Sequence, residues 1–178
     1  MTAEPSERIS MPDAAGADPA AFMIRRDGTW TYQGSGIPRP ALVRLFAGML
    51  RRDAAGGYWL VNKSERQRIV VEDVPFLAVE LRVGGQGSGQ TLDFRTNVDD
   101  WVAAGPEHAI RVEADGGSRG PGFPIPYLEV RDGIEARIAR PVYYQLVDLA
   151  VPRATGDAAR VGIWSRGIFF ELGVLPQP

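Results

Sequence analysis

Two amphipathic helices, each beginning at an Arg-Pro pair, constrain the fold more than any other feature of the sequence. Arg39-Pro40 recurs as Arg140-Pro141, 101 residues further along the chain. The apolar positions of the first helix fall on those of the second at the same offset: Leu42, Leu45, Phe46 and Met49 on Tyr143, Leu146, Val147 and Ala150. Spacings of three and four residues place these side chains on one helix face. The shared pattern indicates a duplicated structural unit.

The segments around the two helices also correspond. An Arg-Asp-Gly turn precedes each helix, at residues 26–28 and 131–133. Strand-like runs follow each helix, and they include 69–72 in the first half and 168–171 in the second. Hairpins, helices and strands can recur by chance, but here element type, element order and helix phase agree together. We therefore favour duplication.

Both Arg-Asp-Gly turns are typical of β-hairpins, because Asp-Gly lies between alternating apolar residues. In the first turn, a three-residue loop over 26–28 pairs Ile24 with Trp30 and keeps the apolar side chains on one face of the sheet. The same reasoning predicts a three-residue loop in the second turn, with Val130 paired with Ile134.

The remaining pattern predicts the fold class. The first helix is expected to run from Arg39 to Arg52, with Pro40 in its first turn and two arginines in its last turn, near the negative end of the helix dipole. The second is expected from Arg140 to about Ala150. β-Branched and aromatic residues predict further strands over 58–62, 68–72, 76–83, 91–96, 109–114, 160–164 and 168–172. The sequence thus predicts an α+β fold with mostly antiparallel sheets, one covering helix per half, and an internally duplicated β-hairpin, helix and β-strand motif.

We expect four segments along the chain. They are a disordered tail over 1–20, an N-terminal α+β domain over 21–114, a Gly/Pro-rich linker or loop over 115–126, and a smaller C-terminal α+β domain over 127–178. The tail is too polar to offset the entropy lost on ordering. The linker is rich in glycine and proline, which break regular structure.

Composition excludes several classes of function. The chain has no cysteine, so disulfides, thiolate nucleophiles and cysteine-ligated metals are absent. Its formal net charge of −2 argues against a nucleic-acid-binding surface, which needs concentrated basic charge. No apolar run approaches the roughly 18 residues of a membrane span. Residues 1–20 lack the apolar core of a signal peptide. We therefore expect a cytoplasmic protein.

Several linked motifs, spread over residues 24–172, resemble a known family. They are Arg26-Asp27-Gly28-Thr29-Trp30, Arg39-Pro40-Ala41-Leu42-Val43-Arg44-Leu45-Phe46, Phe94-Arg95-Thr96-Asn97-Val98-Asp99-Asp100, Val130-Arg131-Asp132-Gly133 and Gly167-Ile168-Phe169-Phe170. In this order they resemble the proteobacterial domain-of-unknown-function family numbered twelve eighty-five. The resemblance implies a two-domain α+β fold with repeated β/α motifs and a role in signal transduction. It implies no catalytic residues.

Three patterns resemble catalytic or ligand motifs, and each fails on its context. Residues 116–120 match a nucleophile elbow, but a Pro-Gly-Phe-Pro run follows and no histidine comes later. Residues 85–89 are glycine-rich but lack the Gly-Lys-Ser/Thr of a P-loop, so we interpret them as a hairpin connection. His108 lies near Asp99, Asp100 and Glu107 without an EF-hand spacing. We interpret that group as acidic turns beside a surface histidine and expect no metal.

Two segments remain as candidate ligand sites. One is the polar run after the strand over 91–96, where a few oriented groups beside Trp101 suit a small ligand, although a turn with a structural ion pair also explains it. The other is the start of each helix, where free N–H groups and an arginine suit an anion, although a plain capped helix also explains it. The candidate residues are Gly34, Ser35, Gly36, Arg39, Arg95, Asn97, Asp99, Asp100 and Arg140.

The sequence therefore predicts a non-enzymatic ligand-binding or protein-interaction module with a regulatory role. The partner is expected to be an anionic small molecule or another protein, and a structural homodimer is a third alternative. We expect no cofactor, no nucleic acid and no membrane. The alternative function is an enzyme that acts on a small acidic metabolite through carboxylates and arginines.

Overall fold

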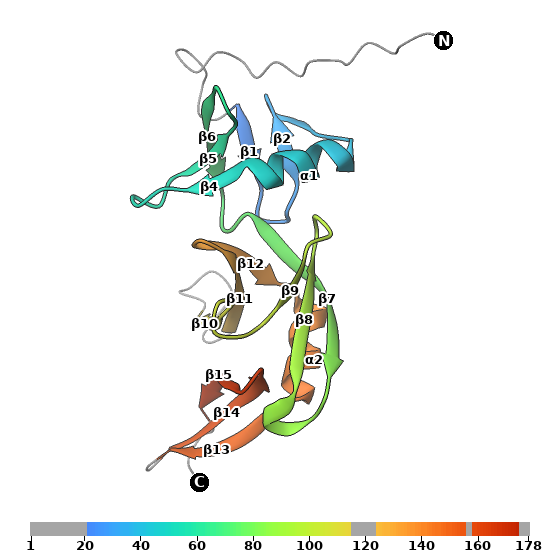
Figure 1. Cartoon of the computed structure of the whole chain (residues 1–178), viewed down its shortest axis with the longest axis vertical. Coiled ribbons are helices and arrows are strands. Elements are labelled where there is room, and N and C mark those ends of the chain that lie inside the picture. The colour runs from blue at the N-terminus through green and yellow to red at the C-terminus, as the bar shows by residue number, and fades with distance from the viewer. Residues whose placement is uncertain (1–20, 115–123, 156–157, 175–178) are drawn as a thin grey trace, which may run out of the picture.

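Strands dominate the structure and form three sheets (Figure 1). The computed structural model describes residues 21–114, 124–155 and 158–174. The first sheet has the order β3 (Ser35–Gly36), β2 (Trp30–Tyr32), β1 (Phe22–Ile24), β6 (Arg66–Val71), β5 (Tyr58–Val61), β4 (Leu50–Arg52). The second has the order β10 (Ile110–Ala114), β11 (Pro124–Arg131), β12 (Ile134–Ile138), β7 (Phe76–Gly84), β8 (Thr91–Thr96), β9 (Trp101–Ala103). The third has the order β13 (Val151–Thr155), β14 (Ala158–Ser165), β15 (Ile168–Val174).

The duplicated motif is present. A hairpin, a helix and a three-stranded antiparallel meander follow one another in each half: β1–β2, α1 (Pro40–Met49) and β4–β5–β6, then β11–β12, α2 (Arg140–Asp148) and β13–β14–β15. One strand of each hairpin also has a parallel neighbour, β6 for β1 and β7 for β12. The other strand pairs of the described residues are antiparallel, so the α+β fold with a duplicated motif is confirmed.

The halves differ in how their strands are shared. In the first, β6 of the meander joins the hairpin to form one sheet, whereas in the second the meander is a separate sheet. The place beside β12 is taken by β7, so β7–β10, which the sequence assigned to an N-terminal domain, lie in the sheet of the second half. The expected tail over 1–20 and residues 115–123 of the expected linker lie outside the described residues. Residues 124–126 begin β11.

The two Arg-Asp-Gly turns have different geometries. The first is the predicted three-residue loop: Ile24 pairs with Trp30, and Gly28 has a φ of 81°. The second prediction was wrong, because Ile134 pairs with Arg131 and not with Val130. A bulge between residues 129 and 131 shifts the register, which lets Val130 and Ile134 both be buried beside a two-residue turn.

The predicted end of the first helix was also wrong. The helix stops at Met49, and Arg51 and Arg52 belong to β4. Leu50 has an extended ψ of 133°, pairs with Leu60 and is fully buried. Packing of this side chain in the sheet therefore outweighs the helical pattern.

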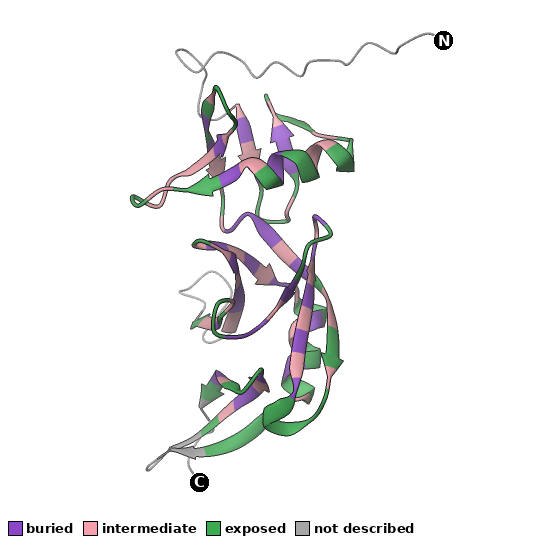
Figure 2. Ribbon diagram, in the orientation of Figure 1, coloured by how far each residue is buried: buried purple, intermediate pink, exposed green. Residues whose placement is uncertain are grey.

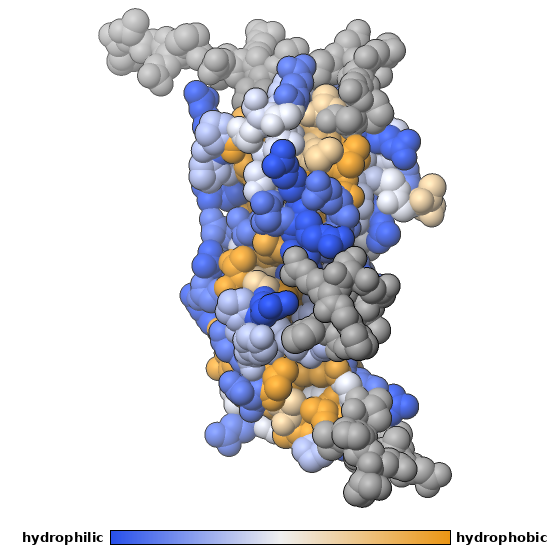
Figure 3. Space-filling view, turned by 180° about the vertical axis from the view of Figure 1, so that it is seen from behind, coloured by the Kyte–Doolittle hydropathy of each residue, from blue (hydrophilic) through white to orange (hydrophobic). Residues whose placement is uncertain are grey.

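One continuous apolar core runs through both halves (Figure 2). In the first half, the ring of Phe46 on α1 packs edge-on against Phe22 on β1, with 5.3 Å between ring centroids. In the second half, Val142 and Leu146 of α2 are buried. The predicted helix faces are confirmed only in part. Phe46 and Leu146 are buried, but Leu45 and Val147 are exposed, and apolar areas are visible on the molecular surface (Figure 3). Neither α-helix of the described residues is long and apolar enough to span a membrane.

Candidate functional site

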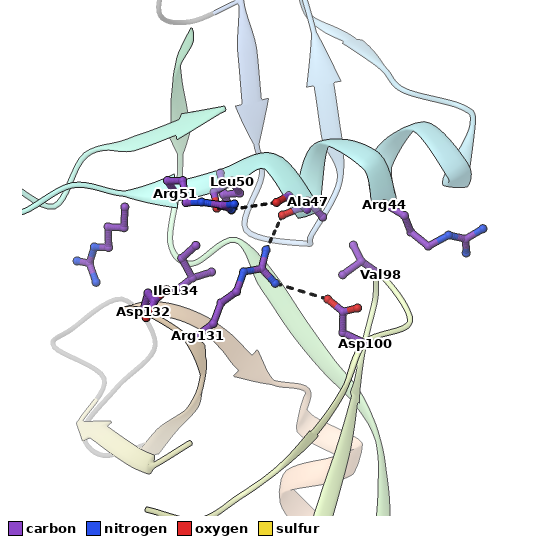
Figure 4. A pocket seen from close by; sticks show the side chains of 11 residues that line it. Arg44, Ala47, Leu50, Arg51, Val98, Asp100, Arg131, Asp132 and Ile134 are labelled. Carbon is purple, nitrogen blue, oxygen red and sulfur yellow. Dashed lines mark hydrogen bonds and ion pairs between the residues drawn. The ribbon is translucent and has the colours of Figure 1, made fainter. Parts of the chain in front are cut away.

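A cleft of about 570 Å³ lies where α1 and β4 of the first half meet the second half (Figure 4). The turns between β8 and β9 and between β11 and β12 form its other walls. We call it the arginine cleft, and its lining residues are Arg44, Ala47, Gly48, Leu50, Arg51, Arg52, Val98, Asp100, Arg131, Asp132 and Ile134. Four arginines and two aspartates give the lining an excess of positive charge, although the whole chain is slightly acidic.

The apolar part of the lining is buried and comes from both halves. Ala47, Leu50, Val98 and Ile134 are each less than 5 % exposed. The charged side chains stand around them and are exposed or half-buried. The cleft therefore offers an apolar floor and a cationic rim, a combination that suits an organic anion with a charged head such as a phosphate.

Arg131 links the two halves at the centre of the cleft. It extends from the end of β11, and its Nη2 donates to the carbonyl oxygen of Ala47 at 2.5 Å, while its Nη1 lies 3.7 Å from Asp100 Oδ2 (Figure 4). Its guanidinium also lies 5.6 Å from the ring centroid of Phe76. Ala47 is in the last turn of α1, where the helix dipole is negative, and its carbonyl oxygen also accepts from the backbone N–H of Leu50. Arg131 thus stabilises the helix end and joins it to the second half.

Two further arginines have only neutral acceptors among the described residues. Arg51 Nη1 donates to the carbonyl oxygens of Gly48 and Leu50, and Arg52 Nη1 donates to that of Gly133 at 2.9 Å. A guanidinium has five N–H donors, so both side chains keep donors that these bonds do not use. Bonds to a carboxylate or phosphate are stronger than bonds to a carbonyl, so an anion in the cleft would compete well for them.

A second, smaller hollow of about 230 Å³ adjoins the arginine cleft and shares Arg44 and Val98 with it. It lies between the start of α1, the β1–β2 turn and the β8–β9 turn. Its other lining residues are Gly28, Thr29, Trp30, Ile37, Pro40, Val43, Asn97 and Asp99. Arg44 extends away from Arg131, so it marks the boundary between the two spaces (Figure 4). We call this space the Trp30 hollow.

The predicted polar segment after β8 lies at these two spaces. Asn97 and Asp99 line the Trp30 hollow, and Asp100 lines the arginine cleft. Arg95 lines neither; its Nη1 donates to Asp99 Oδ1 at 3.0 Å and its Nε to Glu80, and the second bond raises the pKa of Arg95. This segment therefore supplies part of the wall shared by the two halves.

Hydrogen bonds fix the conformation of the same segment. Thr96 Oγ1 accepts from the backbone N–H groups of Val98 and Asp100. Asn97 Oδ1 accepts from the N–H of Leu77, and Asn97 Nδ2 donates to the carbonyl of Gly28 in the first half. One end of the Asn97 amide is thus fixed within the second half, and the other end joins it to the first half.

The other predicted residues lie elsewhere. Gly34 belongs to the turn of the β2–β3 hairpin, and Ser35 and Gly36 pair with β2, so the glycines do not form the entry to α1. Arg39 is the residue before α1, and its side chain makes no capping hydrogen bond. Arg140 is the first residue of α2. Neither space includes any of these residues in its lining.

The described residues contain no group of three or more His, Asp or Glu side chains placed to hold a metal ion. His108 faces the carbonyl oxygen of Glu129, with 3.2 Å between Nδ1 and that oxygen. The glycine-rich run over 85–89 joins the antiparallel strands β7 and β8, as predicted. Residues 116–120 lie outside the described part of the chain.

Sequence reasoning missed the arginines of the cleft. Arg51 and Arg52 were assigned to a helix end, and Arg131 to a hairpin turn. The repeated Arg-Asp-Gly pattern is the one signal that drew attention to Arg131, and the structure places Asp132 of that turn at a positive φ of 40°. Nothing in the sequence indicates that residues some 80 positions apart meet across the two halves.

Comparisons with known proteins agree with the resemblance seen in the sequence. One family model, described as domain of unknown function (DUF1285), N-terminal domain, matches residues 11–74. A second, described as protein of unknown function (DUF1285), C-terminal domain, matches residues 75–172. The two meet between β6 and β7. No curated protein matches the chain.

Two solved structures are similar over most of the chain. A DUF1285 family protein from Silicibacter pomeroyi DSS-3 is 43% identical, with a TM-score of 0.78 over 88% of this chain and 81% of that chain. A DUF1285 family protein from Shewanella baltica OS155 is 26% identical, with a TM-score of 0.54 over 72% of this chain and 91% of that chain. With both family models matched in order and a close relative of the same fold, the chain belongs to the DUF1285 family.

Proposed function

We propose that this protein is a ligand-binding module that holds a small organic anion in the arginine cleft. The observation that carries the proposal is the position of Arg51 and Arg52. Both reach a cleft of about 570 Å³, and both have only carbonyl partners among the described residues. Cavities of roughly 300–1,000 Å³ with an apolar floor and a few polar groups are typical of small-molecule sites.

The solvent exposure of the two carboxylates in the lining favours binding over catalysis. Asp100 and Asp132 are exposed, and Asp100 lies 3.7 Å from Arg131. A general acid or base usually sits in a more enclosed environment that shifts its protonation. The enzymatic alternative, in which these carboxylates act on an acidic metabolite, is less well supported because neither carboxylate lies in an enclosed environment.

The place of the cleft between two halves supports a regulatory role. An anion that takes donors from Arg52 or Arg131 would replace bonds that now join the halves, at Gly133 and Ala47. Ligand binding would then weaken the contact between the halves. A ligand that interacts differently with two arrangements of the halves can shift the protein from one arrangement to the other. A role in signal transduction is consistent with such coupling.

Pyrophosphate binding, measured by isothermal titration calorimetry, tests the proposal. Hydrogen bonds between charged groups contribute about 1.5–3 kcal/mol. Arg52→Gln should therefore weaken binding by about 10–100-fold. Arg68→Gln is the matched control, because Arg68 is an exposed arginine of the same sheet that lines neither space.

The two variants give outcomes that separate a site from general charge attraction. A large loss with Arg52→Gln and a change below about threefold with Arg68→Gln would support the arginine cleft. Equal losses in both variants would contradict it, since bulk electrostatics would then explain the affinity. Absence of heat at millimolar pyrophosphate would also contradict it.

A further inference from the structure

The Trp30 hollow differs in character from the arginine cleft that it adjoins. Five of its lining residues are apolar: Trp30, Ile37, Pro40, Val43 and Val98. Trp30 is only 3 % exposed and Val98 only 4 %, so the wall they form is a fixed part of the core.

Asn97 and Asp99 of the hollow are already engaged, whereas the buried Nε1–H of Trp30 has no hydrogen-bond partner among the described residues. Both ends of the Asn97 amide are bonded, to Leu77 and to Gly28. Asp99 accepts from Arg44 at 2.6 Å and from Arg95 at 3.0 Å. A ligand in the hollow would therefore meet apolar side chains beside polar groups that mostly have partners, whereas a ligand in the cleft meets arginines with unused donors.

We infer that the two spaces form one bipartite site for an amphiphilic organic anion. The anionic head lies among the arginines of the cleft, and an apolar body lies in the Trp30 hollow. Arg44 and Val98, which line both spaces, mark the crossing point. This inference rests on the proposed function, since it assumes that the cleft holds the head, and it adds the chemical class of the remainder of the ligand.

The volumes limit the size of the apolar body. The hollow measures about 230 Å³, less than half the volume of the cleft. That space suits a single ring or a short alkyl chain and is too small for the long chains of a membrane lipid. The expected ligand is thus a soluble anion with a compact apolar group.

Short alkyl phosphates test this class, because they share one head and differ only in apolar length. Each buried methylene group strengthens binding about fourfold. n-Butyl phosphate has three more methylene groups than methyl phosphate and should therefore bind the wild-type protein up to about 60-fold more tightly. Val43→Phe should fill the hollow and reduce this preference to below about fivefold, with methyl phosphate affinity unchanged.

Two controls keep the result interpretable. Leu45→Phe adds the same ring at an exposed position of α1 that lines neither space, and it should leave the butyl preference intact. Val43→Ala removes part of the same wall without adding bulk, and it should lower the butyl preference less than Val43→Phe does. Vesicles of phosphatidylglycerol test a lipid source of the same chemistry, and no sedimentation of protein with them is expected.

The outcomes separate this inference from the proposed function. Equal affinity of the wild-type protein for methyl and n-butyl phosphate would overturn the bipartite site and leave anion binding in place. A butyl preference that survives Val43→Phe, or one that Leu45→Phe removes equally, would place the apolar body elsewhere. Sedimentation with the vesicles would overturn the soluble class. Absence of binding of either phosphate and of pyrophosphate would overturn the proposed function itself.

Discussion

Replacement of Arg131 by methionine tests how strongly this one side chain joins the two halves. Methionine keeps an unbranched stem near Phe76 and removes the donors. The lost bond to the Ala47 carbonyl, made by a charged donor at 2.5 Å, accounts for about 1.5–3 kcal/mol. The ion pair with Asp100, at 3.7 Å and half exposed, adds at most about 1 kcal/mol. We therefore expect Arg131→Met to lower the free energy of unfolding by about 2–4 kcal/mol.

Thermal and urea denaturation measure this loss. For a chain of 178 residues, about 2–4 kcal/mol corresponds to a fall in Tm of roughly 4–15 °C. Asp100→Asn is the matched variant, because it removes only the ion pair and should cost less than about 1 kcal/mol. The reasoning would be refuted if Arg131→Met unfolded within about 0.5 kcal/mol of the wild type, or if Asp100→Asn were equally destabilising.

Two further predictions concern the interface and the second sheet. Gly28→Ala places a Cβ at positive φ only 2.7 Å from Asn97 Nδ2, whereas Gly34→Ala has nearly the same φ and open space. Gly28→Ala should therefore be the more destabilising by at least about 1 kcal/mol in urea denaturation, and equal losses would contradict the close contact. Burial, with a smaller effect from Asp73, raises the pKa of Tyr127 from 10.0 to about 12. The neutral phenol is thus favoured in the folded state, and its contribution to stability should be present below pH 10 and lost as the pH rises towards 12. Burial also raises the pKa of Tyr58 and of Tyr143, so ultraviolet titration should show several late tyrosines, the last of which Tyr127→Phe removes. An unchanged last step in that variant would contradict the assignment.

Elements whose local pattern and packing agree were predictable from the sequence. The strand over 91–96 has the predicted bounds, since Leu92, Phe94 and Thr96 alternate with exposed or half-buried residues and are themselves buried. The first hairpin register also followed from keeping Ile24 and Trp30 on one face. In both cases a single local arrangement satisfies the burial of every apolar side chain.

Elements decided by tertiary contacts were not predictable. Leu50 continues a helical pattern in the sequence, but its place opposite Leu60 makes it part of a strand. β13 contains Pro152, which disfavours a central strand, and it is tolerated because β13 lies at a sheet edge. The bulge before Arg131 shifts the strand register so that Val130 and Ile134 are both buried beside a two-residue turn. The predicted three-residue loop assumed a hairpin without a bulge.

The candidate site divides in the same way. Asn97, Asp99 and Asp100 were predicted as ligand residues because polar residues crowd a short turn, and they line the two spaces. Arg51, Arg52 and Arg131 were missed because their meeting depends on how the second half packs against α1. The local sequence around each arginine does not predict that contact.

The most direct test of the arginine cleft is a map of amide chemical shifts in the ¹⁵N-labelled protein during titration with pyrophosphate. The account predicts concerted, saturable shifts at Arg51, Arg52, Asp132 and Gly133, with β14 and β15 unchanged. Shifts confined to Gly34, Ser35 and Gly36 would contradict it and favour the start of α1 as the anion site. Unchanged spectra at millimolar pyrophosphate would contradict anion binding altogether.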